Sequence, residues 1–254
     1  MNTPFARAAL AVFRKDLRAE LRSRELFSAM ILFSLIAILV FSFALELTSP
    51  LLSINEELRR INELLAEAGS DALQPVDPLN MSSIVGGMFW VVIIFSAILG
   101  LNRSLASERD QGNLDAMLIA PVPRAAIFIG KTFANFLFTL LVGAILLPVI
   151  TFLFDINLVR PELIAVMVLG IFGITTIGTL LAAMAAQTRS RETLLPIIML
   201  PAVLPVLLSV VRASNGIIDG QPADLWSGWL AFIAAIDLVY LGMSYAAFGF
   251  VVED

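Results

Sequence analysis

The sequence contains no cysteine and no histidine. These two absences exclude disulfides, thiolate nucleophiles, Ser-His-Asp triads and metal sites built on Cys or His within this chain. Charged residues are also scarce: they make up 15% of the chain, whereas soluble domains have about 25%. The net charge of −5 argues against nucleic acid as a partner.

Hydrophobic residues, in contrast, make up 59% of the 254 residues, and the mean hydropathy is +0.93. A helix needs ~20 apolar residues to cross the hydrocarbon core of a bilayer. The apolar residues form long, continuous runs, which argues against the alternating pattern of barrel strands. We therefore predict an all-α membrane protein with one transmembrane domain over residues 1–254. The six predicted spans are 27–47, 84–101, 127–154, 163–186, 194–211 and 229–252.

Lysine and arginine are distributed unevenly between the connections. Twelve of the 16 lie before the first span, between the second and third spans with the start of the third, or between the fourth and fifth. The remaining four lie in the other connections. Cytoplasmic loops carry the excess of Lys and Arg, so we predict that both termini are cytoplasmic.

An amphipathic helix is predicted at residues 5–25, before the first span. Its leucine and phenylalanine side chains share one helical face, and basic residues occupy most of the remainder. The apolar face consists of Leu10, Phe13, Leu17 and Leu21. Such a helix lies in the membrane interface and is attracted by anionic membrane lipid. A simple anchor of the positive-inside type is the alternative.

The outer loop at 48–83 is predicted to contain a second amphipathic helix, from Ile54 to Ala68. Ser53 and Glu56 have the spacing of a capping box at its start. This helix either packs on the outer ends of the spans or provides a docking element for another protein.

The segment Gly130-Lys131-Thr132 resembles the end of a phosphate-binding loop. That loop also requires a glycine five residues earlier, between a strand and a helix. Ala125 occupies this position, and the segment begins a predicted membrane span. The sequence therefore predicts no nucleotide site here, and ATP, if used, is bound by another chain.

The cytoplasmic loop at 102–126 combines charged residues, a turn and a short apolar patch before two prolines. The charged and turn residues are Glu108, Arg109, Asp110 and Gly112, and the apolar ones are Leu114, Met117 and Leu118. Pro121 and Pro123 end any helix in this loop. We predict a compact knob on the cytoplasmic face.

This loop, which reads E-R-D-Q-G-N-L-D and then A-P-V-P-R, resembles the coupling loop of ABC-2-type exporter permeases. More narrowly, it is similar to the haem exporter protein B family of the cytochrome c maturation system. The T-R-S-R-E turn at 188–192, the prolines of the fifth span and the C-terminal tail are similar to the same family. The resemblance departs at 48–80, where that family usually has a shorter loop.

The resemblance implies a six-helix ABC-2-type permease of the bacterial inner membrane that is not itself an enzyme. Its partners would be an ABC ATPase subunit, a haem-handling membrane subunit and a periplasmic haem chaperone, and a second permease copy is left open. The seven loop residues named above would transmit ATP hydrolysis, which drives haem delivery or chaperone release. The alternative is an ABC-2 exporter of a lipid, glycan or drug.

No cofactor is expected on this chain: ATP would be bound by the ATPase, and haem by partner chains. Haem iron is commonly held by His, Cys, Met or Tyr, and the chain lacks the first two. We therefore expect that the isolated subunit does not ligate haem stably.

Two features inside the spans are further candidates. Pro196, Pro201 and Pro205 kink the fifth span, either as a conformational device or as a static bend. Asp237 is an intramembrane acid, with a role in transport or a hydrogen bond to Thr175 or Thr176. Small residues in the fourth span predict close helix packing.

Overall fold

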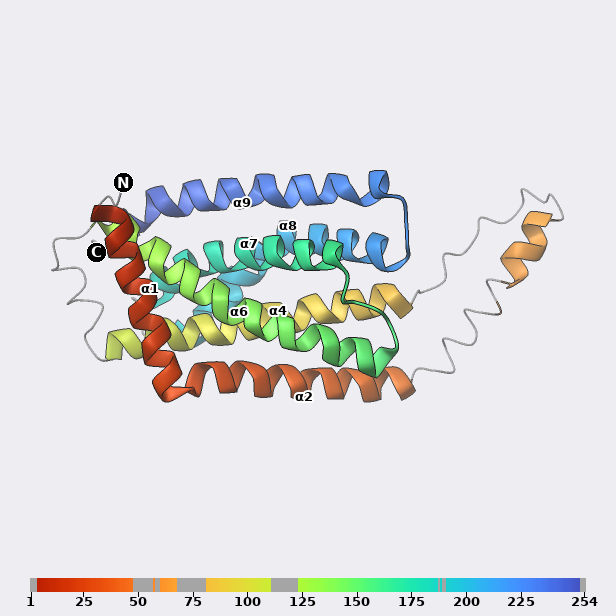
Figure 1. The fold of residues 1–254 in the computed structure, drawn as a ribbon, viewed down its shortest axis with the longest axis horizontal. Coiled ribbons are helices and arrows are strands. Elements are labelled where there is room, and N and C mark those ends of the chain that lie inside the picture. Colours follow the sequence, from red (N-terminus) through yellow and green to blue (C-terminus); the bar gives the residue numbers. More distant parts are fainter. Residues whose placement is uncertain are drawn as a thin grey trace.

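The computed structural model describes residues 4–47, 57, 60–67, 81–110, 123–186, 188 and 191–251, and every element within them is a helix. Helix α1 (Pro4–Ser23) crosses one end of a bundle of long helices (Figure 1). These are α2 (Glu25–Leu47), α4 (Met81–Asp110), α6 (Arg124–Phe154), α7 (Pro161–Ala186), α8 (Arg191–Ile218) and α9 (Ala223–Val251). Within the described part of the chain, six helices are long and apolar enough to span a membrane. The predicted all-α class and the six spans are confirmed.

The helices extend beyond the apolar runs that predicted them. α4 continues from the expected end at 101 to Asp110, so the first part of the predicted loop 102–126 is helical and the loop prediction is wrong there. The physical reason is that the segment 102–110 contains neither glycine nor proline, and its polar residues are compatible with a helix outside the bilayer core. At the opposite end of the bundle, α8 extends from the expected end at 211 to Ile218.

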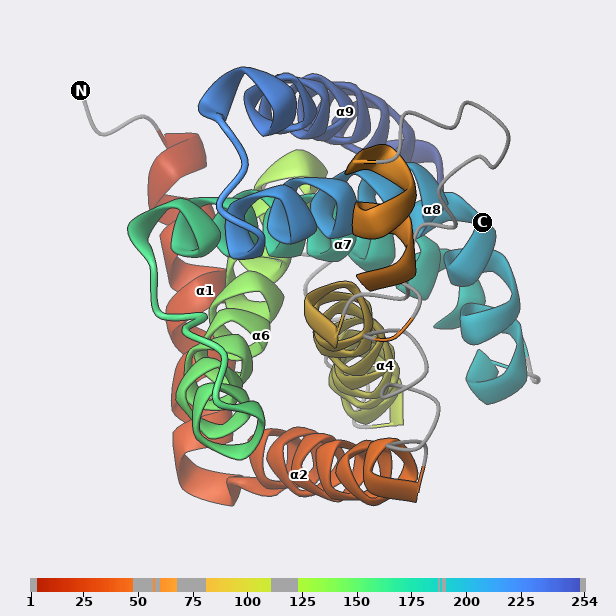
Figure 2. The same ribbon diagram turned by 90° about the vertical axis from the view of Figure 1, so that its right-hand side faces the viewer.

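α4 and α7 form the centre of the bundle. α7 contacts α4, α6, α8 and α9, and α4 also contacts α2, α6 and α8. Viewed along the bundle, α2 and α9 lie at opposite edges (Figure 2). A Cβ atom on Gly170 of α7 would lie 2.6 Å from the Trp90 ring of α4, so the absence of a side chain allows this contact. The close packing predicted for the small residues of this span is therefore confirmed.

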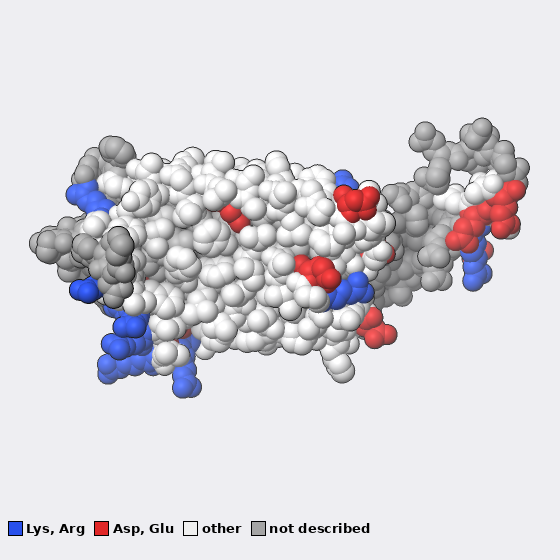
Figure 3. Space-filling view, turned by 45° about the horizontal axis from the view of Figure 1, so that its top comes forward, with Lys and Arg blue, Asp and Glu red and all other residues white. Residues whose placement is uncertain are grey.

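The flanks of the bundle are apolar and its charges gather at the ends. Leu32 and Phe43 of α2 and Leu238 of α9 are largely exposed, as expected for side chains that face lipid. Figure 3 shows most of the Lys and Arg residues at one end, and in Figure 1 the two chain termini lie at that same end. We call it the basic end. By the positive-inside rule it is the cytoplasmic end, which stays a prediction.

Part of the predicted outer-loop helix is present at residues 60–67, while Ser53, Ile54 and Glu56 lie outside the described residues. Ile61 is 46% exposed and Leu64 is 64% exposed. Leu65, which shares the predicted apolar face with Ile61, is partly buried, and the choice between packing on the span ends and docking another protein stays a prediction.

Candidate coupling site at the basic end of the bundle

Helix α1 is seated directly on α6 at the basic end. A Cβ atom on Gly130 of α6 would lie 2.6 Å from the carbonyl oxygen of Ala9 and 2.8 Å from Cβ of Val12. Any side chain at position 130 would therefore push α1 away from α6. The glycine of the Gly-Lys-Thr segment serves helix packing here.

The apolar stripe predicted for α1 is divided by this contact. Phe13 and Leu17 pack against the bundle core, together with Val12. Leu10 is 45% exposed and Leu21 is 65% exposed. The predicted amphipathic helix is present as α1, and the tertiary contact turns half of its apolar stripe toward α6.

A buried ion pair lies beside Gly130. Nζ of Lys131 is 3.5 Å from Oδ2 of Asp16 on α1, and the Lys131 side chain is only 1% exposed. Lys15 pairs with the other oxygen of Asp16 at 3.0 Å, on the more exposed side of the helix. A charge removed from water must be compensated by an opposite charge, and Asp16 provides that charge for Lys131. Lys131 thus faces α1 and does not line a phosphate-binding loop.

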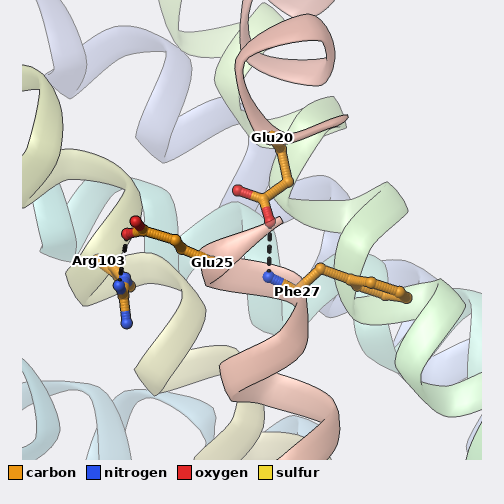
Figure 4. A network of polar contacts seen from close by, with 4 residues as sticks. All are labelled: Glu20, Glu25, Phe27 and Arg103. Atoms are coloured by element: carbon orange, nitrogen blue, oxygen red, sulfur yellow. Dashed lines mark hydrogen bonds and ion pairs between the residues drawn. The ribbon is translucent and has the colours of Figure 1, made fainter. Parts of the chain in front are cut away.

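The junction between α1 and α2 connects both helices to α4 (Figure 4). Arg24 adopts a left-handed conformation with φ of 55°, and the chain turns sharply at this residue. The backbone N–H of Phe27, one of the unpaired donors at the start of α2, donates to Oε1 of Glu20 at 2.8 Å. Glu25 forms an ion pair with Arg103 of α4 at 2.7 Å. α1, α2 and α4 are therefore joined at one corner of the basic end.

The start of α6 and the end of α9 meet at the same end of the bundle. Arg124 donates to the carbonyl oxygen of Gly249 at 3.2 Å. The rings of Phe128 and Phe248 have centroids 5.2 Å apart. Phe5, near the start of α1, lies beside Tyr245 of α9 with ring centroids 6.5 Å apart. α1 therefore extends along α6 from the end of α9 to the start of α2.

The predicted coupling residues lie next to this corner. Glu108, Arg109 and Asp110 are the last three residues of α4, which carries Arg103 one and a half turns earlier. Their side chains are outside the described part of the structure. Gly112, Leu114, Met117 and Leu118 lie outside the described residues, so the coupling role of this set stays a prediction.

The three prolines of the fifth span lie within one continuous helix, α8. Pro201 and Pro205 are exposed on the outward side of this helix, and Pro196 is partly buried. The Tyr240 hydroxyl of α9 donates to the carbonyl oxygen of Ala202, three residues before Pro205. The carbonyl that Pro205 deprives of its helical donor is that of Pro201, so this hydrogen bond lies one residue away from the freed group. Their role in conformational change stays a prediction.

Asp237 is buried in α9 at 4% exposure. Its carboxylate lies against Gly173 of α7, where a Cβ atom would collide with Oδ1. The Thr175 and Thr176 hydroxyls donate to carbonyl oxygens of their own helix, so the expected hydrogen bond to Asp237 is not formed. Neither carboxylate oxygen has a hydrogen-bond partner among the described residues.

Several residues of the basic end escaped the sequence analysis. Asp16, Glu20 and Glu25 lie within the predicted amphipathic helix at 5–25, and no role was predicted for them. Lys131 was examined only as part of a possible phosphate-binding loop. A lysine inside an apolar span indicates that an acidic partner lies close to it. The sequence does not show which acidic residue that partner is.

The sequence is similar to those of one family of membrane proteins. The family model described as CcmB protein matches residues 72–253, which include α4 and α6 to α9. Heme exporter protein B of Paracoccus denitrificans is 30% identical over 166 residues, covering 65% of this chain and 74% of that protein. Heme exporter protein B of Pseudomonas aeruginosa is 25% identical over 168 residues, covering 66% and 75%. Since the family model matches well over half of the sequence, this chain belongs to the CcmB protein family.

Proposed function

We propose that this chain is the membrane subunit of an ATP-driven ABC complex in cytochrome c biogenesis. It is a multi-pass protein of the bacterial inner membrane with six membrane-spanning helices. The proposal rests on its membership of the CcmB family and on relatives named heme exporter protein B. In this function, ATP hydrolysis by a separate ATPase subunit drives haem delivery or the release of a haem-loaded periplasmic chaperone.

The contacts at the basic end support a route for this coupling. The Glu25–Arg103 pair joins α2 to the part of α4 that ends at Glu108–Asp110. The Lys131–Asp16 pair joins α1 to α6. A movement imposed on the end of α4 by an ATPase would therefore reach three spans through short polar contacts and rigid helices. Contacts between packed helices transmit a displacement because each helix moves as a rigid body.

ATP and haem are assigned to other chains in this proposal. The Gly-Lys-Thr segment is buried in the contact between α6 and α1, which supports a nucleotide site on a partner ATPase. The absence of histidine removes the commonest ligand of haem iron. A haem-handling membrane subunit and a periplasmic chaperone would therefore hold the haem, with this chain driving the change between their states.

The proposal is tested by complementation in a bacterium that lacks its own CcmB protein. The wild-type chain should restore c-type cytochromes, measured by haem-stained gels and absorbance spectra of membranes. The variants Glu108→Ala and Gly112→Pro should insert into the membrane at wild-type amounts but lower cytochrome c at least tenfold. Glu67→Ala, in the exposed helix at 60–67, is the matched control and should behave as wild type.

If the wild-type chain restores no cytochrome c while it is inserted and co-purifies with the host ATPase, the assigned pathway is wrong. Normal cytochrome c in both Glu108→Ala and Gly112→Pro would instead contradict the coupling role of 108–118.

A further inference from the structure

The contact with α6 determines which side of α1 faces outward. Asp16 and the backbone of Ala9 lie against Lys131 and Gly130, so the opposite side of the helix faces away from the bundle. Four exposed arginines lie on that side, with the spacings of seven, four and four residues that place side chains on one helical face. They are Arg7, Arg14, Arg18 and Arg22. We call them the arginine face.

The acidic residues of α1 are separated from the arginine face. Asp16 and Glu20 are the only acidic residues between Pro4 and Ser23. Asp16 pairs with the buried Lys131, and Glu20 accepts the backbone N–H of Phe27. Both carboxylates are therefore engaged at the bundle side, and the helix contributes only positive charge to its outward side.

The position of α1 places this face at the border of the bundle. α1 runs across the span axes in Figure 1, and in Figure 2 it lies beside α6 at the edge of the bundle. Its outward side therefore faces the surroundings of the bundle at the height of the span ends. Leu10 and Leu21, exposed by 45% and 65%, lie along the edge of the arginine face near its two ends.

We propose that the arginine face of α1 binds the headgroups of anionic phospholipids in the leaflet at the basic end. A guanidinium group forms charge-assisted, often bidentate hydrogen bonds with phosphate oxygens. The two leucines at the edge of the face would enter the acyl region, as apolar side chains of interfacial helices do. A row of single-sign charge along a helix, bordered by exposed leucines, fits a lipid surface, where phosphates and acyl chains lie side by side.

The structure changes what the sequence pattern alone indicated. The sequence placed Phe13 and Leu17 on the same apolar face as Leu10 and Leu21, whereas in the structure Phe13 and Leu17 pack on the bundle. Lipid attraction therefore depends mainly on the arginines, with a smaller apolar contribution from Leu10 and Leu21. The binding should accordingly be selective for anionic over zwitterionic lipid and weakened by salt, because salt screens exposed charges.

The test uses the full-length protein in non-ionic detergent, titrated with fluorescent phosphatidylglycerol or phosphatidylcholine of equal chain length. The double variant Arg14→Gln/Arg18→Gln should lose about 25-fold in affinity for phosphatidylglycerol, roughly fivefold per arginine. Its affinity for phosphatidylcholine should not change. Arg60→Gln/Arg212→Gln, which removes two exposed arginines outside the basic end, is the matched control and should bind phosphatidylglycerol as the wild type does.

Two further arms keep the test decisive. Arg14→Lys/Arg18→Lys retains the charge and should keep most of the affinity, which separates a loss of charge from a loss of folding. Inorganic phosphate at millimolar concentration should not displace the lipid, since a free anion gains nothing from the leucines. Equal affinity of the wild type for the two lipids would overturn the proposal. Unchanged phosphatidylglycerol affinity in Arg14→Gln/Arg18→Gln would also overturn it. If that variant keeps its lipid affinity but no longer co-purifies with another protein, the arginine face binds protein and the proposal is wrong.

Discussion

The interpretation of Lys131 changes once its neighbours in the structure are known. In the sequence it follows a glycine and precedes a threonine, as the lysine of a phosphate-binding loop does. In the structure it is 1% exposed and faces Asp16 of α1. A buried lysine without a counter-charge would cost several kcal/mol, so the pair makes the attachment of α1 to α6 specific.

Replacing Lys131 by methionine should therefore loosen α1. The variant leaves Asp16 in an apolar contact without its buried partner, and breaking such a pair costs about 3 kcal/mol. We expect trypsin to cleave at Arg14 and Arg18 at least tenfold faster in detergent, measured by mass spectrometry of the fragments. Lys15→Met is the matched control, because this more exposed partner of Asp16 contributes ~0–1 kcal/mol.

Adding Asp16→Asn to Lys131→Met should restore much of the protection, because the carboxylate that has lost its buried partner and keeps the more exposed Lys15 is then replaced by a neutral group. Equal cleavage rates in the wild type and in Lys131→Met would show that the pair does not hold α1 in place.

At the scale of one element, α8 combines three prolines with an unbroken helical path. A proline inside a helix removes one backbone hydrogen bond and costs about 3 kcal/mol. The outward position of Pro201 and Pro205 means that their rings do not fill the bundle core. Packing in the core therefore does not require them, and the hydrogen bond from Tyr240 to the Ala202 carbonyl ties α9 to this part of α8.

Pro205→Ala should accordingly be as stable as the wild type or more stable, by up to ~3 kcal/mol, because a backbone hydrogen bond is regained. If the proline allows α8 to bend during the transport cycle, the same variant should yield less cytochrome c in the complementation assay. The unfolding midpoint in detergent and the cytochrome c yield are measured together.

Pro148→Ala, which replaces an exposed proline inside α6, is the matched control. It should show a similar gain in stability and a normal cytochrome c yield. A normal cytochrome c yield in Pro205→Ala would show that the kink is static.

At the scale of the whole molecule, the bundle has one basic end that carries α1 and both termini, and a nearly uncharged middle (Figures 1 and 3). An even number of spans requires both termini on the same side. The charge distribution then sets the orientation, since positively charged segments are retained on the cytoplasmic side.

The orientation is testable directly because the chain has no cysteine of its own. Single cysteines at exposed positions report their side of the membrane with a membrane-impermeant maleimide. Glu67→Cys and Asp224→Cys should react in cells whose outer membrane is permeabilised, and Ser23→Cys should react only after the inner membrane is opened. The reverse pattern would invert the topology and place α1 and the predicted coupling residues in the periplasm.

The sequence by itself determined the helical class, the six spans and the separation of basic residues toward one end. These properties follow from the length of apolar runs and the positions of Lys and Arg, which are local features. Its predicted span ends stopped short for α4 and α8, because helices continue through polar residues once they leave the bilayer core.

Only the tertiary structure decided which side of α1 packs, which acid compensates Lys131 and what surrounds Asp237. Each of these depends on residues far apart in the chain: Asp16 with Lys131, and Asp237 with Gly173. Helical periodicity says which side chains share a face, but the energy of a buried charge or of a close backbone contact depends on the partner across the interface. That partner is set by how the helices pack.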